Sequence, residues 1–159
     1  MFQSELYQGS LEEKYEMLTK QLDALLVGED DLIANLANAS ALLSQFLDQV
    51  NWVGFYLLKE NELVLGPFQG LTACVRIPVG KGVCGTAVAK NETMLVPDVH
   101  KFPGHIACDA ASRSEIVIPI RTNGNIVAIL DIDSPIPDRF STEEKGYLET
   151  FTQVLEKHI

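Results

Sequence analysis

Two carboxylates end a segment that otherwise has the pattern of an apolar β-strand. Asp131 and Asp133 are two positions apart, so both side chains project from one strand face, which Val127 and Ile129 continue. The acids are solvated if the strand leaves the core at this point. In a pocket, burial and mutual repulsion would instead raise at least one carboxyl pKa, leaving a protonated acid that can donate a proton at neutral pH.

Glu115 and two aromatic residues are candidates for the same pocket. Glu115 opens the neighbouring segment, which is expected to pair with the strand of Asp131, so it is either a third pocket carboxylate or an ordinary strand-end charge. Trp52 and Tyr56 share one face of another expected strand. They are core aromatics or, if they face the carboxylates, a wall able to hold a methyl group, a thioether or a cation.

The three cysteines, Cys74, Cys84 and Cys108, are the candidate nucleophiles. Their odd number argues against a disulfide framework, and their spacing differs from the short paired spacings of zinc ribbons. Each is either a small buried hydrophobe or a redox-active or nucleophilic thiol. Cys108 precedes Asp109–Ser112, which we expect to begin a helical turn; a helix start favours a thiolate, whereas nearby carboxylates disfavour it.

The segment 97–114 around Cys108 shows little periodicity, and a long irregular stretch inside a compact domain is usually functional. One interpretation is that Cys108 is a nucleophile on a loop over the pocket. The alternative is a metal site formed by His100, His105 and Cys108, with Asp98, although this spacing matches no familiar zinc pattern.

The elements that position these residues follow from hydrophobic periodicity. Three- and four-residue steps predict two helices within about residues 10–47, a short helix over 83–89 and a last helix over about 142–158. The expected strands cover residues 51–59, 63–68, 73–79, 93–96, 115–121 and 125–133. The Asn123-Gly124 pair predicts a hairpin between the last two. This order indicates an α+β fold, a central antiparallel sheet of about five to six strands flanked by helices.

Composition limits the classes of protein. The 159 residues are 47% hydrophobic, which suits one compact domain and argues against disorder. The longest unbroken apolar run, 126–130, is far shorter than the ~20 residues that span a bilayer. The net charge of −10, without a cluster of Lys and Arg, excludes nucleic acid as a partner. Met1–Leu6 has neither a basic nor an apolar signal region, so we expect a cytoplasmic protein.

Several blocks closely resemble the free methionine-(R)-sulfoxide reductases, GAF-domain enzymes that reduce the free amino acid. The blocks are NWVGFY (51–56), GPFQG (66–70), CVRIP (74–78), GVCGTA (82–87), DVH (98–100), HIACDA (105–110), SEIV (114–117) and LDIDS (130–134). They contain all three cysteines. The resemblance covers nearly the whole chain, densest over 51–134, and implies that residues 1–159 form a single GAF domain.

The resemblance also implies roles for these residues. Cys108 matches the family's cysteine that attacks the sulfoxide sulfur. Cys74 matches the cysteine that resolves the resulting sulfenic acid as a disulfide. Cys84 matches a further cysteine in the pocket. The residues expected to bind substrate are Trp52, Tyr56, Glu115, Asp131 and Asp133. The implied reductant is thioredoxin, the implied assembly is a homodimer, and no metal or organic cofactor is needed. The alternatives are a non-catalytic GAF sensor of a small ligand and a thiol redox switch.

Overall fold

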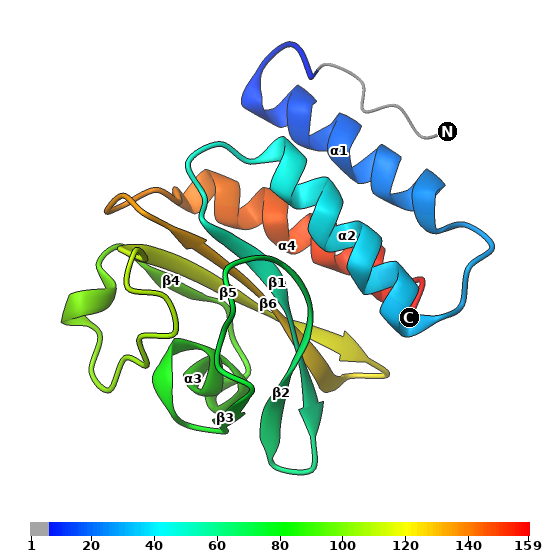
Figure 1. The fold of residues 1–159 in the computed structure, drawn as a ribbon. Helices are drawn as coiled ribbons and strands as arrows, with labels where there is room; N and C mark the ends of the chain where they lie inside the picture. Colours follow the sequence, from blue (N-terminus) through cyan, green and yellow to red (C-terminus); the bar gives the residue numbers. More distant parts are fainter. Residues whose placement is uncertain (1–6) are drawn as a thin grey trace.

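A six-stranded antiparallel sheet forms the centre of the computed structural model, which describes residues 7–159 (Figure 1). The expectation about a signal region in Met1–Leu6 lies outside the described residues. The strands are β1 (Trp52–Lys59), β2 (Glu62–Gly70), β3 (Arg76–Pro78), β4 (Met94–Val96), β5 (Ser114–Thr122) and β6 (Asn125–Ser134). Their order across the sheet is β3-β2-β1-β6-β5-β4. The predicted α+β fold with an antiparallel sheet is confirmed.

Three long helices lie on one side of the sheet, and a short helix lies on the other (Figure 1). The long helices are α1 (Leu11–Leu26), α2 (Leu32–Phe46) and α4 (Thr142–Glu156), and the short ones are α3 (Gly82–Lys90) and the 3-10 turn η1 (Val99–Lys101). The side chains of Ser10, Asp31 and Ser141 accept a backbone N–H of the first turn of α1, α2 and α4, respectively. Such caps each stabilise a helix by about 1 kcal/mol. Within residues 7–159, no helix is long and apolar enough to cross a bilayer.

The period-2 alternation of the central strands divides the buried side chains into two cores. Val53 and Phe55 of β1 pack beneath the long helices, together with Leu130 of β6. Trp52 and Tyr56 of the same strand pack on the other side, with α3. The alternation read from the sequence is therefore confirmed, and the chemically interesting residues of β1, β5 and β6 share the face that α3 covers.

One local prediction around the cysteines is wrong, and another is confirmed only as a single turn. The strand expected over 73–79 is only Arg76–Pro78, and Cys74 precedes it in the irregular segment 71–75. The carbonyl of Cys74 accepts the hydroxyl of Tyr56 at 2.9 Å. The helical turn expected after Cys108 is a single turn, because the Asp109 side chain accepts the N–H of Ala111 and the chain then enters β5.

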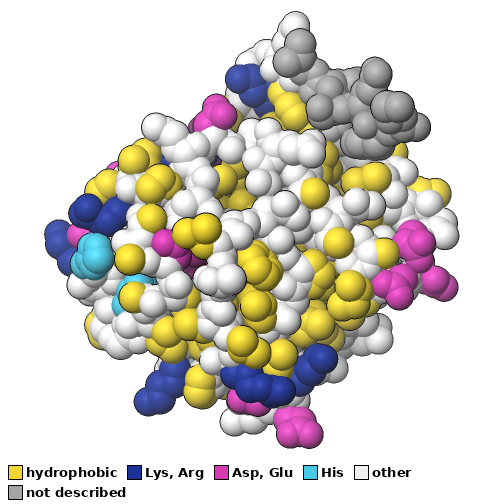
Figure 2. All heavy atoms as spheres, viewed as in Figure 1, with side chains coloured by type: hydrophobic (Ala, Val, Ile, Leu, Met, Phe, Trp, Pro, Cys, Tyr) yellow, Lys and Arg dark blue, Asp and Glu magenta, His cyan; other side chains and the backbone are white. Residues whose placement is uncertain are grey.

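Segment 71–75 crosses the α3 side of the molecule and leaves apolar side chains outside. Leu71 and Val75 are 69% and 63% exposed. Figure 2 shows hydrophobic side chains gathered over the middle of this face. Backbone contacts nevertheless hold the segment in place, since the Leu65 N–H donates to the Val75 carbonyl at 2.9 Å.

Candidate active site

The pairing of β5 with β6 brings the three candidate carboxylates together. Glu115 lies opposite Asp133, and Val117 lies opposite Asp131, so the three acids project from the face that α3 covers. Glu115 and Asp131 are buried, with 5% and 6% exposure, and Asp133 is half-buried. Glu115 and Asp131 are therefore pocket acids and not solvated charges at a strand end.

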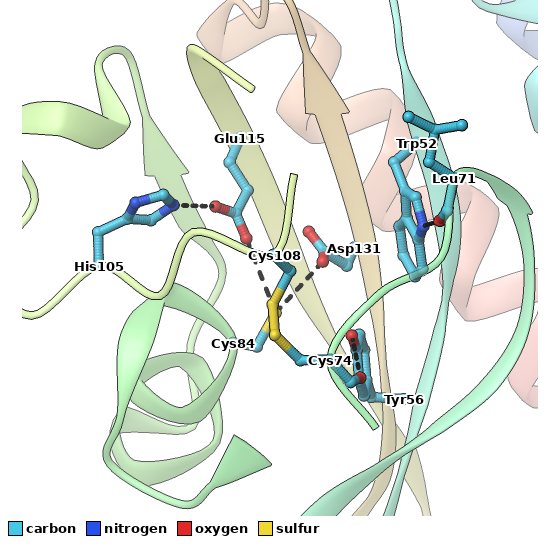
Figure 3. Close-up of a disulfide and its surroundings, with 9 residues drawn as sticks. All are labelled: Trp52, Tyr56, Leu71, Cys74, Cys84, His105, Cys108, Glu115 and Asp131. Carbon is cyan, nitrogen blue, oxygen red and sulfur yellow. Dashed lines mark hydrogen bonds and ion pairs between the residues drawn. A yellow bond between two sulfur atoms is a disulfide. The ribbon is translucent and has the colours of Figure 1, made fainter. Parts of the chain in front are cut away.

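Helix α3 adds a thiol to this acid cluster. Cys84 Sγ lies 3.4 Å from Asp131 Oδ2 and 3.7 Å from Glu115 Oε1 (Figure 3). Helix α3 also packs closely against β3, which is possible because Gly85 has no side chain. A Cβ at this position would clash with the carbonyl of Pro78. The thiol is buried and is the one free cysteine within residues 7–159.

Burial sets the protonation of the cluster. It raises the pKa of Glu115 well above its usual range, and the charges of Asp131 and Asp133 raise it further. Burial also raises the pKa of Asp131 to about 6, while hydrogen bonds from Glu115 and Cys84 oppose the rise. The pKa of Asp133 is raised by burial and by Asp131 and Asp109. At neutral pH the cluster consequently retains protons and can act as a general acid.

Cys84 stays a thiol in these surroundings. Burial raises its pKa well above the usual value, and the charges of Asp131 and Glu115 raise it further. The thiol can therefore donate to Asp131, whose second oxygen, Oδ1, is buried without a hydrogen-bond partner. A buried acceptor without a hydrogen-bond partner costs stability. It is typical of a binding site in which the ligand supplies the hydrogen-bond donor.

The two remaining cysteines are bonded to one another. Cys74 and Cys108 form a disulfide with a Cα–Cα distance of 5.5 Å, and both are half-buried. Cys108 lines a cavity together with Cys84, the three carboxylates and Tyr56. The other residues that line this cavity are Ile77, Gly82, Val83, His105, Ile106, Asp109 and Ser112. The nucleophile candidate and the acid candidates thus share one cavity.

The predicted aromatic wall stands beside this cavity (Figure 3). Trp52 and Tyr56 have ring centroids 5.9 Å apart, and the Trp52 indole N–H donates to the Leu71 carbonyl at 3.1 Å. Phe68 stacks on Trp52 with centroids 5.1 Å apart. A Cβ on Gly54 would clash with Phe68, so glycine permits this stack. Sequence reasoning missed Phe68, because the register of β1 and β2 shifts between Gly54 and Tyr56 and the sequence does not show which residues face each other.

Two polar contacts around the Cys108 segment were also missed. His105 Nε2 lies 3.8 Å from Glu115 Oε2, and burial lowers the histidine pKa, which the neighbouring His100 lowers further. Asn51 Nδ2 donates to Asp109 Oδ2 at 2.9 Å and to Ser112 Oγ at 3.2 Å. Asn51 thereby fixes the turn that follows Cys108.

The metal interpretation of the segment 97–114 gains no support from the geometry. Within residues 7–159, the one group of three side chains whose ligand atoms all lie within 4.8 Å of one another is Cys84, Glu115 and Asp131. The set of His100, His105 and Cys108 is not such a group, since Cys108 is in the disulfide.

Comparison with known proteins shows which family the chain is similar to. Residues 31–159 match the GAF domain model. A relative from Escherichia coli, called free methionine-R-sulfoxide reductase, is 54% identical, over 91% of this chain and 88% of its own length. The reduced form of fRMsr from Staphylococcus aureus is 58% identical, with a TM-score of 0.89 over 91% of this chain and 94% of that one. A substrate complex of free methionine-R-sulfoxide reductase from Neisseria meningitidis is 42% identical, with a TM-score of 0.92 over 98% and 94%.

The matched model and the curled sheet between helices define a GAF domain. More narrowly, the chain belongs to the free methionine-R-sulfoxide reductase family, which is a family of enzymes. The predicted family and the prediction of an enzyme are thus confirmed.

Proposed function

We propose that this protein reduces free L-methionine-(R)-sulfoxide to L-methionine, with Cys108 as the nucleophile. The observation that carries the proposal is the single cavity in which Cys108 lies with Glu115, Asp131 and Asp133. A sulfoxide oxygen is a poor leaving group until it is protonated, and a buried carboxylic acid supplies that proton. The names of the relatives from E. coli and N. meningitidis support the choice of substrate.

In the first step the Cys108 sulfur attacks the sulfoxide sulfur while Glu115 protonates the sulfoxide oxygen. The new sulfur–sulfur bond and the bond between the substrate sulfur and its oxygen then break, as the oxygen passes to Cys108 as a sulfenic acid and methionine leaves. The substrate sulfur thereby gains the two electrons that the cysteine sulfur loses. The thiol proton of Cys108 remains in the carboxylate cluster and restores the proton on Glu115. The raised pKa of Glu115 suits it to both transfers.

In the second step the Cys74 thiol attacks the sulfenic acid, releases water and leaves the Cys74–Cys108 disulfide. The Cα–Cα distance of 5.5 Å is within the range that a disulfide requires. An external dithiol, thioredoxin in this proposal, returns both cysteines to the thiol state. Cys84 completes the catalytic set as a buried thiol that donates to Asp131 and takes no part in the disulfide exchange.

Preference for the free amino acid follows from charge. The carboxylates that do not transfer the proton pair with the substrate's α-ammonium group, which methionine inside a peptide lacks. Asp131 Oδ1 is a buried acceptor without a partner and suits such a donor. Trp52 and Tyr56 would contact the methyl end of the substrate. A homodimer stays a prediction of the resemblance, and a cytoplasmic location stays a prediction from the sequence of Met1–Leu6.

Turnover of three substrates tests the proposal. Free L-methionine-(R)-sulfoxide, its (S) epimer and N-acetyl-methionine-(R)-sulfoxide are incubated with the protein, first with dithiothreitol and then with thioredoxin, thioredoxin reductase and NADPH. We expect sustained turnover of the free (R) form alone. No turnover by fully reduced protein would indicate a ligand sensor, and a single turnover without cycling would indicate a redox switch.

Three cysteine variants assign the steps. Cys108→Ser should lose the first turnover, Cys74→Ser should complete one turnover and then stall with thioredoxin, and Cys84→Ser should continue to cycle. A first turnover by Cys108→Ser would refute its role as the nucleophile. Sustained thioredoxin-driven cycling by Cys74→Ser would show that another thiol resolves the sulfenic acid.

A further inference from the structure

The two cysteines of the disulfide have different neighbours along the chain, and of the two only Cys108 lines the cavity. Cys108 is followed by Asp109 and lines the cavity that contains Glu115, Asp131 and Asp133. Cys74 lies within residues 63–91, which contain no acidic residue although the whole chain has 22. The charged residues of that stretch are Arg76, Lys81 and Lys90. Arg76 forms an ion pair with Glu62, so the stretch that carries Cys74 contributes no acid of its own.

The surface beside Cys74 is apolar and held in place. Val75 and Leu71 expose most of their side chains on either side of it in the segment 71–75. The carbonyls of Leu71, Cys74 and Val75 all accept hydrogen bonds, from Trp52, Tyr56 and Leu65. Large apolar side chains that are exposed on an ordered segment are typical of a protein contact.

We infer that segment 71–75 is the docking surface for a thioredoxin-type dithiol protein, and that the thiolate of this partner attacks Cys74 and not Cys108. The inference rests on the proposed function, in which the disulfide is an intermediate of turnover. Attack on Cys108 would bring the partner's thiolate into the cavity that the carboxylates line, whereas Cys74 does not line that cavity and lies between the exposed side chains of Leu71 and Val75. An apolar surface next to the target sulfur fits a partner that presents its own reactive thiol on an uncharged surface.

The exchange balances without a further reactant. The partner's thiolate forms a bond to Cys74 Sγ while the bond between Cys74 and Cys108 breaks, and Cys108 leaves as a thiolate. A protonated carboxyl of the cluster, of which Glu115 has a strongly raised pKa, gives that thiolate its proton. The partner's second thiol then attacks the mixed disulfide and releases Cys74. The partner becomes a disulfide, and its two electrons leave both cysteines of this chain reduced.

Trapping the mixed disulfide tests which sulfur is attacked. The oxidised protein is mixed with a thioredoxin whose second active-site cysteine is replaced by serine, quenched with acid, digested and analysed by mass spectrometry. We expect thioredoxin bonded to the peptide that contains Cys74. A mixed disulfide on the Cys108 peptide would overturn the inference.

Substitutions of Val75 test the docking surface. Val75→Glu places a carboxylate beside Cys74 and should raise the KM for thioredoxin about tenfold, and Val75→Ser should raise it about threefold. Turnover of Val75→Ser with dithiothreitol should be unchanged, because the side chain lies outside the cavity and this small reductant needs no docking surface. Val27→Ser is the matched control, since Val27 is 68% exposed on the helical side and Val75 is 63% exposed.

The outcomes separate this inference from the proposed function. If wild-type protein does not turn over the sulfoxide with dithiothreitol, the proposed function fails. If dithiothreitol supports turnover and Val75→Glu keeps the wild-type KM for thioredoxin, the docking surface is wrong. A Val75→Glu variant that keeps this KM but sediments at a lower mass than the wild type would show that segment 71–75 binds a second copy of the chain, which also overturns the inference.

Discussion

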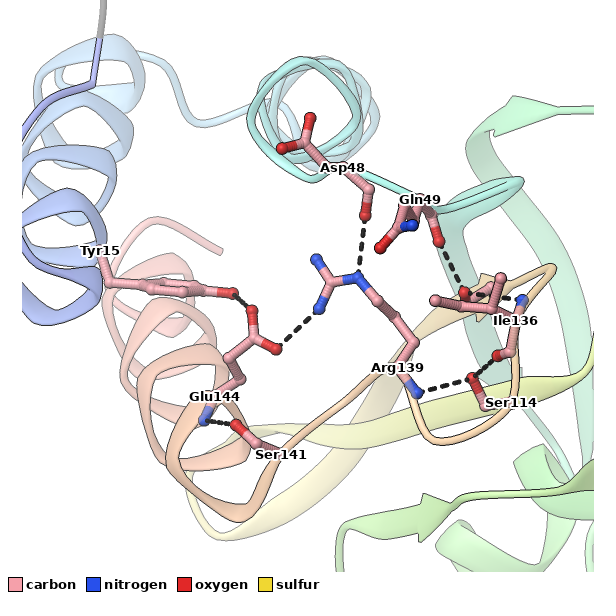
Figure 4. Close-up of polar contacts among 9 residues, drawn as sticks. Tyr15, Asp48, Gln49, Ser114, Ile136, Arg139, Ser141 and Glu144 are labelled. Atoms are coloured by element: carbon pink, nitrogen blue, oxygen red, sulfur yellow. Dashed lines mark hydrogen bonds and ion pairs between the residues drawn. The ribbon is translucent and has the colours of Figure 1, made fainter.

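Two buried glutamates on opposite sides of the sheet have opposite surroundings. Glu144, at the start of α4, is 7% exposed; its Oε2 lies 2.7 Å from Arg139 Nη1, and its Oε1 accepts the Tyr15 hydroxyl at 3.0 Å (Figure 4). Glu115, on the α3 side, is 5% exposed and lies among other acids. Its nearest basic group is His105, at 3.8 Å. One buried carboxylate is therefore neutralised by an arginine, and the other is not.

The difference separates a structural network from a catalytic one. Arg139 also donates from Nε to the Asp48 carbonyl at 2.9 Å, so the Glu144 network ties α1, α4 and the chain after α2 together. Every charge in it has a partner, which is what a buried ion pair needs to persist. On the α3 side, Asp131 Oδ1 has none. Acids whose charge is not compensated cost stability, and such a cost is typical of a functional site.

Substitutions in the acid cluster should have the largest effect, and that effect should be on activity. Glu115→Gln or Asp131→Asn removes an ionisable group from the cluster, so kcat/KM for the sulfoxide should fall by ~10²–10⁴. The melting temperature should stay equal or rise, because the substitution removes an acid whose pKa burial has raised. Steady-state kinetics and thermal unfolding measure the two quantities on the same samples. A variant that melts much earlier and keeps full activity per folded molecule would reverse the assignment.

Glu144→Ala should produce the opposite result. It leaves the half-buried Arg139 without its carboxylate and removes the acceptor of Tyr15, so we expect a loss of about 3 kcal/mol in the free energy of unfolding. The kcat per folded molecule should be unchanged. Urea unfolding gives the stability, and Tyr15→Phe, which removes only the hydroxyl, should cost about 1 kcal/mol. A fall in kcat with unchanged stability would place Glu144 in the catalytic network.

The sequence predicts the site face but not the structural network. Asp131 and Asp133 share a face because strand alternation is a local rule, and the turn at Asn123-Gly124 fixes which strand they meet. The contact of Tyr15 with Glu144 joins residues 129 positions apart, so no local pattern indicates it. The irregular path at Cys74 was missed for the same reason, since Tyr56 and Cys108 hold it from distant parts of the chain.

The acid cluster should also appear in the pH dependence of stability. The pKa of Asp131 is raised from its usual value near 4 to about 6, so between these values the folded protein binds more protons than the unfolded chain. The free energy of unfolding of the wild type, measured relative to Asp131→Asn, should therefore fall as the pH rises from about 4 to 6. We expect a change on the order of 1 kcal/mol in urea titrations at several pH values. A difference that grows with pH over this window would mean that the folded-state pKa is lowered, contrary to the effect of burial.

The smallest expected effect distinguishes two asparagines. Asn51 donates to Asp109 and Ser112 beside Cys108, whereas Asn35 donates to the Glu29 and His158 carbonyls at 3.0 and 2.9 Å on the helical side. Asn51→Ala loosens the turn that carries the nucleophile, so kcat should fall about fivefold, equivalent to about one hydrogen bond. Asn35→Ala should lower the free energy of unfolding by about 1–3 kcal/mol and leave kcat unchanged.

A single-turnover measurement shows whether Asn51 acts on Cys108 or on the stability of the whole fold. If Asn51 acts by orienting Cys108, Asn51→Ala should slow methionine release in the first turnover, while KM for the sulfoxide changes less than kcat. A general loosening of the fold would instead lower the melting temperature and affect both parameters through the folded fraction. Equal effects of Asn51→Ala and Asn35→Ala on kcat per folded molecule would contradict this prediction. They would show that the hydrogen bonds of Asn51 are no more important for catalysis than those of Asn35.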